Sequence, residues 1–343
     1  INLSIYVPSG KNIGNITADI NKTVINGTPL QNSINPSDEY LIVGKFDLLP
    51  KANIIPIGKQ KIKQMKKLTF YALCMLLFFC CKREDVTQYA PTENYPTDTS
   101  LSSIENKKAM IVIAHDDDMC GTTGTISMLN NAGWEIRVLS FPQSEERNKA
   151  HKRACKNILD SVIFFNISHS EFRNDLNETE KLYEAIAKLK FNNLFNYDIV
   201  ERQLIKQVND FEPAVIFTLD NLVGAYGHPE HVFISQMVLD LSEADSISPS
   251  YIYQNVFTDH MENTIMARHS KRMKEWGFAG DDWEITKQTY DVDGAPEPTT
   301  EINIEKYAQQ KMNYLRSYNE RERKIMGFFI PAFEEYSAAE YFK

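Results

Sequence analysis

Short apolar runs alternate with stretches of helical character between residues 108 and 260. Each run is flanked by charged or turn-forming residues, which is typical of a strand buried on both faces of a sheet. Strands that alternate with helices pair in parallel through right-handed crossovers. The sequence therefore predicts an α/β fold: a doubly wound, mostly parallel Rossmann-like sheet with helices on both faces. The expected strands are Met110–Ala114, Glu135–Phe141, Ser161–Ile167, Ala214–Leu219 and Ser250–Val256.

Helices are expected between these strands and after the last one. Gly133 follows the first helix and suits a helix C-cap, because glycine adopts the left-handed conformation readily. Residues 257–303 hold Trp276 and Trp283 and could cover the ligand crevice of such a sheet, although core packing is the more frequent use of tryptophan. The expected helices are Gly121–Ala132, Glu145–Leu159, Glu178–Leu189, Asp198–Phe211 and Pro229–Leu241.

A segment of different composition, residues 65–81, precedes the α/β region. It reads MKKLTFYALCMLLFFCC, a basic start and an apolar run shorter than the roughly 20 residues that span a bilayer. This pattern is typical of a secretory signal peptide. Because cysteines end the run, we expect an exported bacterial lipoprotein in the periplasm or at the cell surface. Its only membrane attachment would be a lipid on Cys80 or Cys81. A buried core helix is the alternative.

Two further segments flank the signal. Residues 1–64 carry no chemical motif and precede Met65, where a signal peptide would begin. We interpret them as an upstream extension that does not belong to the natural protein, with a small β-rich N-terminal segment as the alternative. Residues 82–107 are polar and include two prolines, so they are predicted to be a flexible linker. Residues 108–343 would then form a single domain.

The charge balance and the cysteines limit the function. The formal net charge is -9, whereas nucleic-acid-binding proteins concentrate Lys and Arg on one face. We therefore expect no nucleic-acid partner. The cysteines of the domain, Cys120 and Cys155, form neither a disulfide framework nor a Cys-x-x-Cys metal site. Cys120 lies two residues after Asp118, but a small buried thiol is the more common state of such a cysteine.

The first chemical motif, AHDDDM, covers Ala114–Met119 directly after the first strand. In open α/β sheets, ligands bind in the crevice beyond the carboxyl ends of the strands. A histidine followed by three aspartates is costly to bury there unless a positive charge compensates it. A divalent cation would do so, because imidazole and carboxylate groups are the ligands of catalytic zinc sites. The alternative, an aspartate that only caps the next helix, needs one Asp rather than three.

The second motif, YGHPEH, covers Tyr226–His231 after the fourth strand. With Pro229 in the first helical turn, His228 and His231 stand three residues apart near a helix start and face the same side. A His-x-x-His pair alone is more often structural. Together with the first motif, it supplies the third ligand that a catalytic zinc site requires.

The two motifs together resemble those of the N-acetylglucosaminyl-phosphatidylinositol de-N-acetylase family, also called PIG-L/LmbE-like. The first family motif is Ala-His-Pro-Asp-Asp-Glu followed by a Gly-Thr-Ile helix start, here Gly124–Ile126. The second is His-Pro-Asp-His, here His228–His231. The resemblance covers about residues 108–260. Asp116 stands where the motif has proline and Met119 where it has glutamate, and the missing glutamate would be expected to orient a ligand.

This resemblance implies a metal site and its catalytic groups. His115, Asp118 and His231 would bind the metal, expected to be Zn2+ or another divalent metal such as Fe2+. Asp117 would act as the general base on a water molecule. His228 would polarise the acetyl carbonyl and stabilise the charge that develops on its oxygen, and it could also protonate the leaving amine.

The resemblance also implies a substrate. Tyr226 would help to orient it, and Arg147 lies where family members carry a substrate-contacting arginine, although a solvated helix-face arginine is equally consistent. We expect a zinc-dependent hydrolase that removes N-acetyl groups from an amino sugar or glycoconjugate, such as an N-acetylglucosamine derivative. The alternative is a catalytically weak or inactive carbohydrate-binding member of the same fold. No Gly-x-Gly-x-x-Gly follows the first strand, which argues against a dinucleotide-binding oxidoreductase.

Overall fold

The structure is a computed structural model that describes residues 93–174, 184–317 and 338–343, together with four strands near the start of the chain. The chain divides into two units, Ile1–Arg83 and Glu84–Lys343. Among the described residues, no helix is both long enough and apolar enough to cross a bilayer.

The first unit contains a four-stranded antiparallel sheet in the order β3-β2-β1-β4. This sheet does not decide whether residues 1–64 are an upstream extension or a β-rich segment of the natural protein, so both readings stay predictions. The expected signal peptide at residues 65–81 lies outside the described residues, so export and lipidation stay predictions. The strands are β1 (Asn2–Tyr6), β2 (Asn12–Asp19), β3 (Val24–Gly27) and β4 (Leu41–Lys45).

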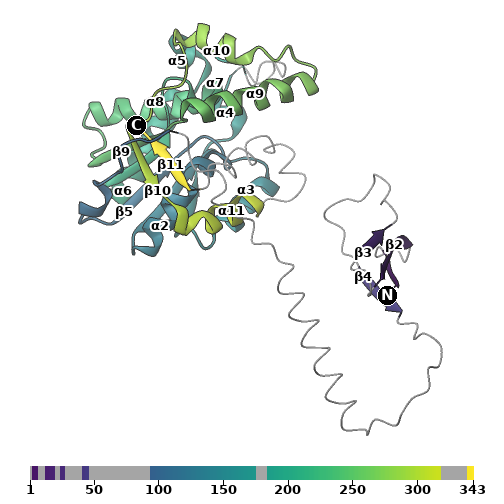
Figure 1. The fold of residues 1–343 in the computed structure, drawn as a ribbon. Coiled ribbons are helices and arrows are strands. Elements are labelled where there is room, and N and C mark those ends of the chain that lie inside the picture. Colours follow the sequence, from purple (N-terminus) through teal and green to yellow (C-terminus); the bar gives the residue numbers. More distant parts are fainter. Residues whose placement is uncertain are drawn as a thin grey trace, which may run out of the picture. The chain divides into compact units, whose positions relative to one another are not determined.

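The second unit is built on a seven-stranded sheet in the order β10-β11-β9-β8-β5-β6-β7 (Figure 1). Neighbours from β9 to β7 are parallel, whereas β11 pairs antiparallel with β9 and β10. The chain adds β6 and β7 on one side of β5 and then returns to add β8 and β9 on the other. The predicted doubly wound α/β sheet is confirmed, and its strand order switches between β5 and β8. The strands are β5 (Lys108–Val112), β6 (Glu135–Ser140), β7 (Ser161–Phe164), β8 (Val215–Leu219), β9 (Tyr251–Asn255), β10 (Thr300–Asn303) and β11 (Ala339–Phe342).

Helices cover both faces of this sheet. Successive side chains of a strand point to opposite faces, so Ala109 and Ile111 of β5 enter one core while Met110 and Val112 enter another. Strand β5 is therefore buried on both sides, as its uninterrupted apolar run predicts. The first core is closed by α2 (Thr123–Asn131), α3 (Glu145–Cys155) and α11 (Ala308–Arg316), and the second by α6 (Tyr197–Phe211) and α8 (Pro229–Glu243).

The remaining elements are shorter or follow β9. Helices α9 and α10 lie within residues 257–303, the segment expected to cover the crevice, and α10 packs against α7 (Figure 1). These helices are α4 (His169–Phe172), α5 (Phe191–Leu194), α7 (Gly224–Gly227), α9 (Asp259–Glu275) and α10 (Asp282–Tyr290). The 3-10 turns are η1 (Leu101–Ser103), η2 (Asp118–Gly121), η4 (Lys188–Lys190) and η5 (Glu305–Tyr307).

Strands β10 and β11 were not expected from the sequence. Each has four residues, and neither TEIN nor AEYF forms the continuous apolar run of a central strand. The helix expected at Glu178–Leu189 is described only from residue 184, where residues 184–187 are not helical and the turn η4 follows.

The segment expected to be a flexible linker differs from that expectation where the structure describes it. From residue 93 onward it packs against the domain. Thr97 forms a bridge with Glu301 of β10, and Leu101 is buried in the first core. Its polar composition concealed this packing, because backbone hydrogen bonds to the edge strand β10 and a few scattered apolar side chains hold it.

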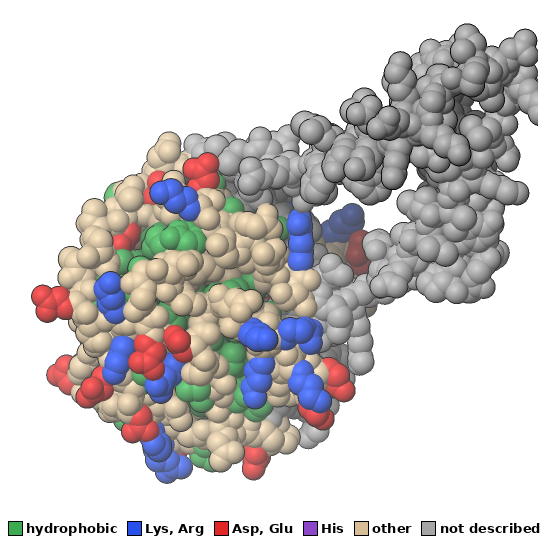
Figure 2. All heavy atoms as spheres, turned by 90° about the horizontal axis from the view of Figure 1, so that it is seen from below, with side chains coloured by type: hydrophobic (Ala, Val, Ile, Leu, Met, Phe, Trp, Pro, Cys, Tyr) green, Lys and Arg blue, Asp and Glu red, His purple; other side chains and the backbone are tan. Residues whose placement is uncertain are grey.

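Figure 2 shows one face of the molecule, on which Lys and Arg side chains occur beside Asp and Glu side chains with hydrophobic groups between them. Surfaces that bind nucleic acids instead concentrate Lys and Arg. The mixture on this face is compatible with the expectation of no nucleic-acid partner, which stays a prediction.

Candidate metal centre

Two loops meet at the carboxyl ends of β5 and β8, where the strand order switches. The first loop follows β5 and carries His115–Asp118 into the turn η2. The second follows β8 through α7 and enters α8, with His228–His231 at the start of that helix. Ligands of open α/β sheets bind at such switch points. The structure thus brings both sequence motifs to one place.

The carboxylate of Asp118 is fixed by the backbone of its own loop. Its Oδ2 accepts hydrogen bonds from the N–H groups of Ala114 (3.1 Å) and His115 (2.7 Å). Its Oδ1 lies 3.1 Å from Nε2 of His231, and Oδ2 lies 3.6 Å from Nδ1 of His115. Burial raises the pKa of Asp118, but the imidazoles of His231 and His115 outweigh burial and hold that pKa well below its usual range. Asp118 is therefore an ionised carboxylate directed at two imidazoles.

Each of these imidazoles is oriented by an acceptor on its far side. Nε2 of His115 lies 2.9 Å from Oε2 of Glu230, and Nδ1 of His231 lies 2.9 Å from the carbonyl oxygen of Gly224. A carboxylate and a carbonyl only accept hydrogen bonds, so these two nitrogens carry the ring protons. In neutral rings, the facing nitrogens Nδ1 of His115 and Nε2 of His231 are then both unprotonated, and they lie 2.9 Å apart.

Three electron-pair donors therefore converge: the facing nitrogens of His115 and His231 and Oδ1 of Asp118. Such a set is unfavourable unless a cation lies between its members. Zinc bonds of about 2.0–2.1 Å would hold tetrahedral ligands about 3.3 Å apart. The separations of 2.9 Å between the nitrogens and 3.1 Å from His231 to Asp118 are close to that spacing, so the residues fit a divalent metal ion. The negative charges that favour a cation here also favour a proton on His115. Burial lowers the pKa of His115, but Asp118 and Glu230 raise it well above its usual value.

His228 lies beside these imidazoles but is held differently. Its Nδ1 accepts a hydrogen bond from the backbone N–H of Glu230 at 3.3 Å and so caps α8. Its ring stacks on His231 and meets His115 edge-on, with 4.7 Å between ring centroids in both pairs. Burial, then the charges of His115 and His231, lower the pKa of His228 well below its usual value. The ring of His228 is therefore neutral and carries its proton on Nε2, so that nitrogen is a hydrogen-bond donor. A ring nitrogen of His228 also lies within 4.8 Å of ring nitrogens of His115 and His231, close enough for the three to hold a metal ion.

The other two aspartates of the first motif pair with Arg147 of α3. Nη2 of Arg147 lies 3.0 Å from Oδ1 of Asp117 and also contacts Oδ1 of Asp116. Burial, together with the charge of Asp117, raises the pKa of Asp116 to about 7. The side chain of Asp117 is 17% exposed. One of its carboxylate oxygens lies within 4.8 Å of possible metal-binding atoms of His115 and Asp118. The predicted base thus lies beside the predicted ligands, and the predicted substrate-contacting arginine is an ion-pair partner of the acidic loop.

Tyr226 borders a small cavity next to the predicted ligands. The cavity has a volume of about 30 Å³, which is room for one or two waters, and Asp118 and His231 also line it. The ring of Tyr226 meets that of His231 edge-on, with 5.2 Å between centroids. Cys120 lines the same cavity, where burial and the nearby carboxylates raise the pKa of its thiol well above the usual value. Cys120 is thus a buried neutral thiol, as the sequence analysis favoured.

Strained backbone positions the second loop. Ala225 has φ 71° and ψ −49°, close to a γ-turn conformation that residues other than glycine adopt only at a cost. The carboxylate of Asp220 holds this turn, because it accepts hydrogen bonds of 2.7–3.0 Å from backbone N–H groups within residues 222–225. Gly224 has φ 57°, and a Cβ there would lie 2.6 Å from Cβ of His231. The turn thus sets the Gly224 carbonyl against the ring of His231.

Some residues that hold the site were not expected from the sequence. Glu230 stands where the second family motif has aspartate; it contacts His115 and pairs with Arg173 at 2.8 Å. The hydroxyl of Tyr314 on α11 donates to the carbonyl of Asp116 at 2.7 Å. No motif marks Arg173 or Tyr314, because each comes from a distant element. The one available signal was the place of Glu230 inside the second motif.

The C-terminal elements also hold the helix that follows the first motif. Glu340 of β11 accepts hydrogen bonds from the N–H groups of Gly124 (2.9 Å) and Thr125 (2.7 Å) at the start of α2. It also pairs with Lys311 of α11 at 2.8 Å, and both side chains are 1% exposed. Met119, which replaces the motif glutamate, is fully buried in the first core. This position is therefore apolar here, and a carboxylate from β11 caps α2.

Part of the second unit is similar to proteins of a known family. Residues 110–242, which include both motifs, match the PIG-L family, described as GlcNAc-PI de-N-acetylase. A curated relative from Dictyostelium discoideum, named "Probable N-acetylglucosaminyl-phosphatidylinositol de-N-acetylase", is 27% identical over 146 residues. The alignment covers 42% of this chain and 53% of the relative. The chain thus spans about half the length of that relative.

Solved structures resemble the chain at low identity. A conserved protein from Thermus thermophilus gives a TM-score of 0.43 at 13% identity, over 69% of this chain and 93% of its own. The N,N'-diacetylchitobiose deacetylase from Pyrococcus horikoshii gives 0.39 at 14% identity, over 71% of this chain and 88% of its own. At these values the likenesses carry no argument about the site or the activity.

Proposed function

We propose that the second unit is a metal-dependent deacetylase that hydrolyses the N-acetyl group of an amino sugar or glycoconjugate. The observation that carries the proposal is the convergence of His115, Asp118 and His231, with 2.9 Å between Nδ1 of His115 and Nε2 of His231 and 3.1 Å between that Nε2 and Oδ1 of Asp118. The match of residues 110–242 to the PIG-L family supports the acetylated amino sugar as the substrate class.

The groups around this convergence have complementary roles in the proposed hydrolysis. A divalent cation bound by His115, Asp118 and His231 would lower the pKa of a water that it holds and would polarise an acyl oxygen. Asp117 would accept the proton of the water that attacks the acetyl carbonyl. Arg147 contacts the Asp117 carboxylate at 3.0 Å and so keeps it beside the ligand atoms.

His228 and Asp117 would complete the reaction. The neutral ring of His228 presents Nε2–H, a donor for the negative charge that develops on the acetyl oxygen. The proton held by Asp117 would then pass to the amine nitrogen as the C–N bond breaks, which yields acetate and the free amino sugar. The cavity of about 30 Å³ beside Tyr226 suits a small acyl group rather than a sugar ring, which would remain outside it.

Acetate release tests the proposal. The purified protein is incubated with N-acetylglucosamine or N,N'-diacetylchitobiose, and acetate is measured. We expect release that stops on chelation and returns when Zn2+ or Fe2+ is added. Asp117→Asn should lower kcat by about 10²–10⁴-fold with unchanged metal content. Asp210→Asn, at an exposed position of α6, is the matched control and should retain the wild-type rate.

One result would favour the carbohydrate-binding alternative. If the protein bound these sugars equally well with and without chelator and released no acetate from either, the proposed hydrolysis would be wrong. The buried Met119 would then be the first place to look for the lost activity, because the family motif has glutamate there.

We also propose that residues 65–81 direct export and that Cys80 or Cys81 carries a lipid. The basic start of the segment and the cysteines that end its apolar run support this proposal. Intact mass of protein purified from its natural source should show a chain that begins at one of these cysteines with the mass of a lipid added. A mature chain that contains Ile1–Gln64 would contradict it.

A further inference from the structure

We propose that Arg173 is a positioning residue of the metal centre. Through Glu230, it fixes which nitrogen of His115 carries the ring proton and so leaves Nδ1 available to the metal. The inference rests on the proposed function, because it takes His115 as a metal ligand. It assigns a role to a side chain that belongs to neither motif.

A chain of direct contacts joins Arg173 to the centre. Nη1 of Arg173 lies 2.8 Å from Oε1 of Glu230, and the other oxygen, Oε2, lies 2.9 Å from Nε2 of His115. The side chains of Arg173 and Glu230 are each 1% exposed, so bulk water does not compete for these contacts. The two oxygens of the carboxylate face different partners, Oε1 toward Arg173 and Oε2 toward His115, so a rotation of Glu230 would break both contacts.

The position of Arg173 is set by the fold. Its backbone forms an antiparallel bridge with Phe195, and the N–H of the next residue, Asn174, donates to the carbonyl of Leu194 at 2.9 Å. The guanidinium lies 5.5 Å from the centroid of the Phe195 ring. An aromatic face and a carboxylate are both favourable neighbours of a guanidinium. The charge of Arg173 is therefore in place before any metal or substrate binds.

The contact matters because a neutral imidazole binds a metal only through its unprotonated nitrogen. The hydrogen bond made by one ring nitrogen decides which nitrogen is left to the metal. Without Arg173, the carboxylate of Glu230 would lie buried without its paired cation and would turn toward other donors. Arg147 does not replace it, because Arg147 pairs with Asp116 and Asp117 on the other loop. His115 would then lose the acceptor that selects its tautomer.

Zinc affinity of the purified protein is the first test. Dissociation constants are measured by competition with a chromophoric chelator for the wild type and for Arg173→Met, which removes the charge and keeps a long side chain. We expect Arg173→Met to bind Zn2+ about 10–100-fold more weakly, the usual loss when a group that orients a ligand is removed. Arg173→Lys should recover part of the affinity. Arg202→Met, at an exposed position of α6, removes the same charge elsewhere and should change nothing.

A second readout follows the ring proton itself. In the zinc-loaded wild type, the Nε2 proton of His115 should resonate far downfield because it is donated to a carboxylate. Heteronuclear correlation to the His115 ring assigns this signal, because replacing His115 would also remove a proposed metal ligand. In Arg173→Met the signal should move upfield or disappear through exchange with water. A side chain that only supported packing would not change it selectively.

The outcomes separate this inference from the proposed function. Folded Arg173→Met with wild-type zinc affinity and an unchanged Nε2 proton signal would overturn the inference and leave the deacetylase proposal standing. If Arg173→Met does not fold, Glu230→Gln tests the same link and should weaken zinc binding by a similar factor; unchanged affinity would overturn it. A wild type that binds zinc but releases no acetate would contradict the proposed function and leave the inference standing.

Discussion

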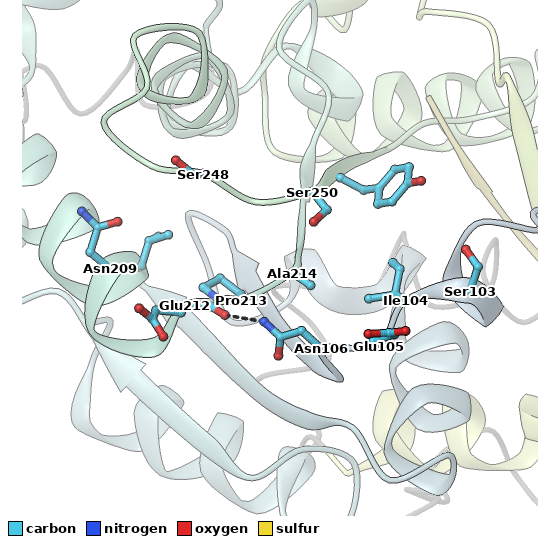
Figure 3. Close-up of a pocket in the computed structure, with 12 residues that line it drawn as sticks. Ser103, Ile104, Glu105, Asn106, Asn209, Glu212, Pro213, Ala214, Ser248 and Ser250 are labelled. Carbon is cyan, nitrogen blue, oxygen red and sulfur yellow. Dashed lines mark hydrogen bonds between the residues drawn. The ribbon is translucent and has the colours of Figure 1, made fainter.

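The two ends of the same parallel strands gather very different surroundings. At the carboxyl ends, a cluster of imidazoles and ion-paired carboxylates lies beside a cavity of about 30 Å³, which Asp117, Asp118 and His231 help to line. At the amino ends of β8 and β9 lies a hollow of about 830 Å³, lined by small polar and loop side chains such as Ser103, Asn209 and Ser250 (Figure 3). One contact drawn there is a 3.1 Å hydrogen bond from Nδ2 of Asn106 to the carbonyl of Glu212. The larger hollow and the cluster of potentially reactive side chains therefore lie at opposite ends of the sheet.

The comparison teaches that chain topology, rather than empty space, locates the site. Loops at the amino ends mainly finish one element and begin the next, as Glu212 does with its left-handed φ of 55° at the end of α6. Loops at the carboxyl ends diverge at the switch point and leave space in which side chains from both can meet. Substitutions should accordingly have large effects at one end and small effects at the other.

The largest effect is expected from His231→Ala at the carboxyl ends. It removes one of three converging donors, so bound zinc should be lost and kcat should fall by about 10³-fold, equivalent to several kcal/mol. Metal analysis of the purified variant and acetate release measure the two effects. Full zinc content in this variant would show that the converging donors are not the metal site.

The next largest effect is expected from Lys311→Met in the C-terminal elements. It leaves the carboxylate of Glu340 buried without its cation, which should lower the free energy of unfolding by about 3–5 kcal/mol. Urea unfolding measures this change. Adding Glu340→Gln should restore part of the stability, because it removes the unpaired charge while keeping an acceptor for α2.

A pH-dependent effect is expected from His151 of α3, which is fully buried. Neither of its ring nitrogens has a hydrogen-bond partner in the part of the chain that the structure describes. Burial, with a smaller contribution from Arg147, lowers its pKa to about 3 from 6.5. Below pH 6.5 the unfolded chain binds a proton that the folded chain does not, so stability falls as the pH drops toward 3.

Between pH 6.5 and about pH 4, this difference amounts to about 3 kcal/mol. His151→Leu should remove that part of the pH dependence, and urea unfolding at several pH values measures it. Parallel pH curves for the variant and the wild type would be evidence against a neutral buried His151.

A smaller effect is expected at the strained turn of the second loop. Ala225→Gly relieves a positive φ of 71° and should raise the free energy of unfolding by about 0.5–1 kcal/mol, since the relief exceeds the cost of a more flexible unfolded chain. Thermal unfolding at matched metal content checks the sign. A decrease would mean that the Ala225 methyl group contributes more through packing than its backbone costs.

The smallest effect is expected in the large hollow at the amino ends. Asn209→Ala removes a surface hydrogen bond to the carbonyl of Ser246 and should change stability by no more than about 0.5 kcal/mol. Zinc affinity and acetate release should equal those of the wild type. A clear loss of either would mean that the hollow takes part in function after all.

Local patterns were sufficient to predict the sheet and the place of the histidine and aspartate motifs at its carboxyl edge. Strand β5 is an apolar run buried on both faces, and the histidines and aspartates follow strands whose ends must meet at the switch point. Each of these inferences needs only neighbouring residues and one topological rule.

The supports of the site could not be predicted in the same way. Arg173, Tyr314 and Glu340 reach it from a loop, from α11 and from β11, and each is an isolated polar residue in a sequence without a motif. Strand β11 itself is short and antiparallel, so it breaks the alternation on which the prediction of the sheet depended. Only three-dimensional packing reveals which distant charges become neighbours.

The cap that Glu340 provides to Gly124 joins residues 216 positions apart in the chain. A ribosome that adds about 5–20 residues per second needs about 10–40 s to cross that interval. The second motif is synthesised about halfway through this interval, while the first turn of α2 still lacks its carboxylate partner. A nascent chain stalled before β11 should therefore hold the start of α2, and the acidic loop that leads into it, less firmly than the finished chain does.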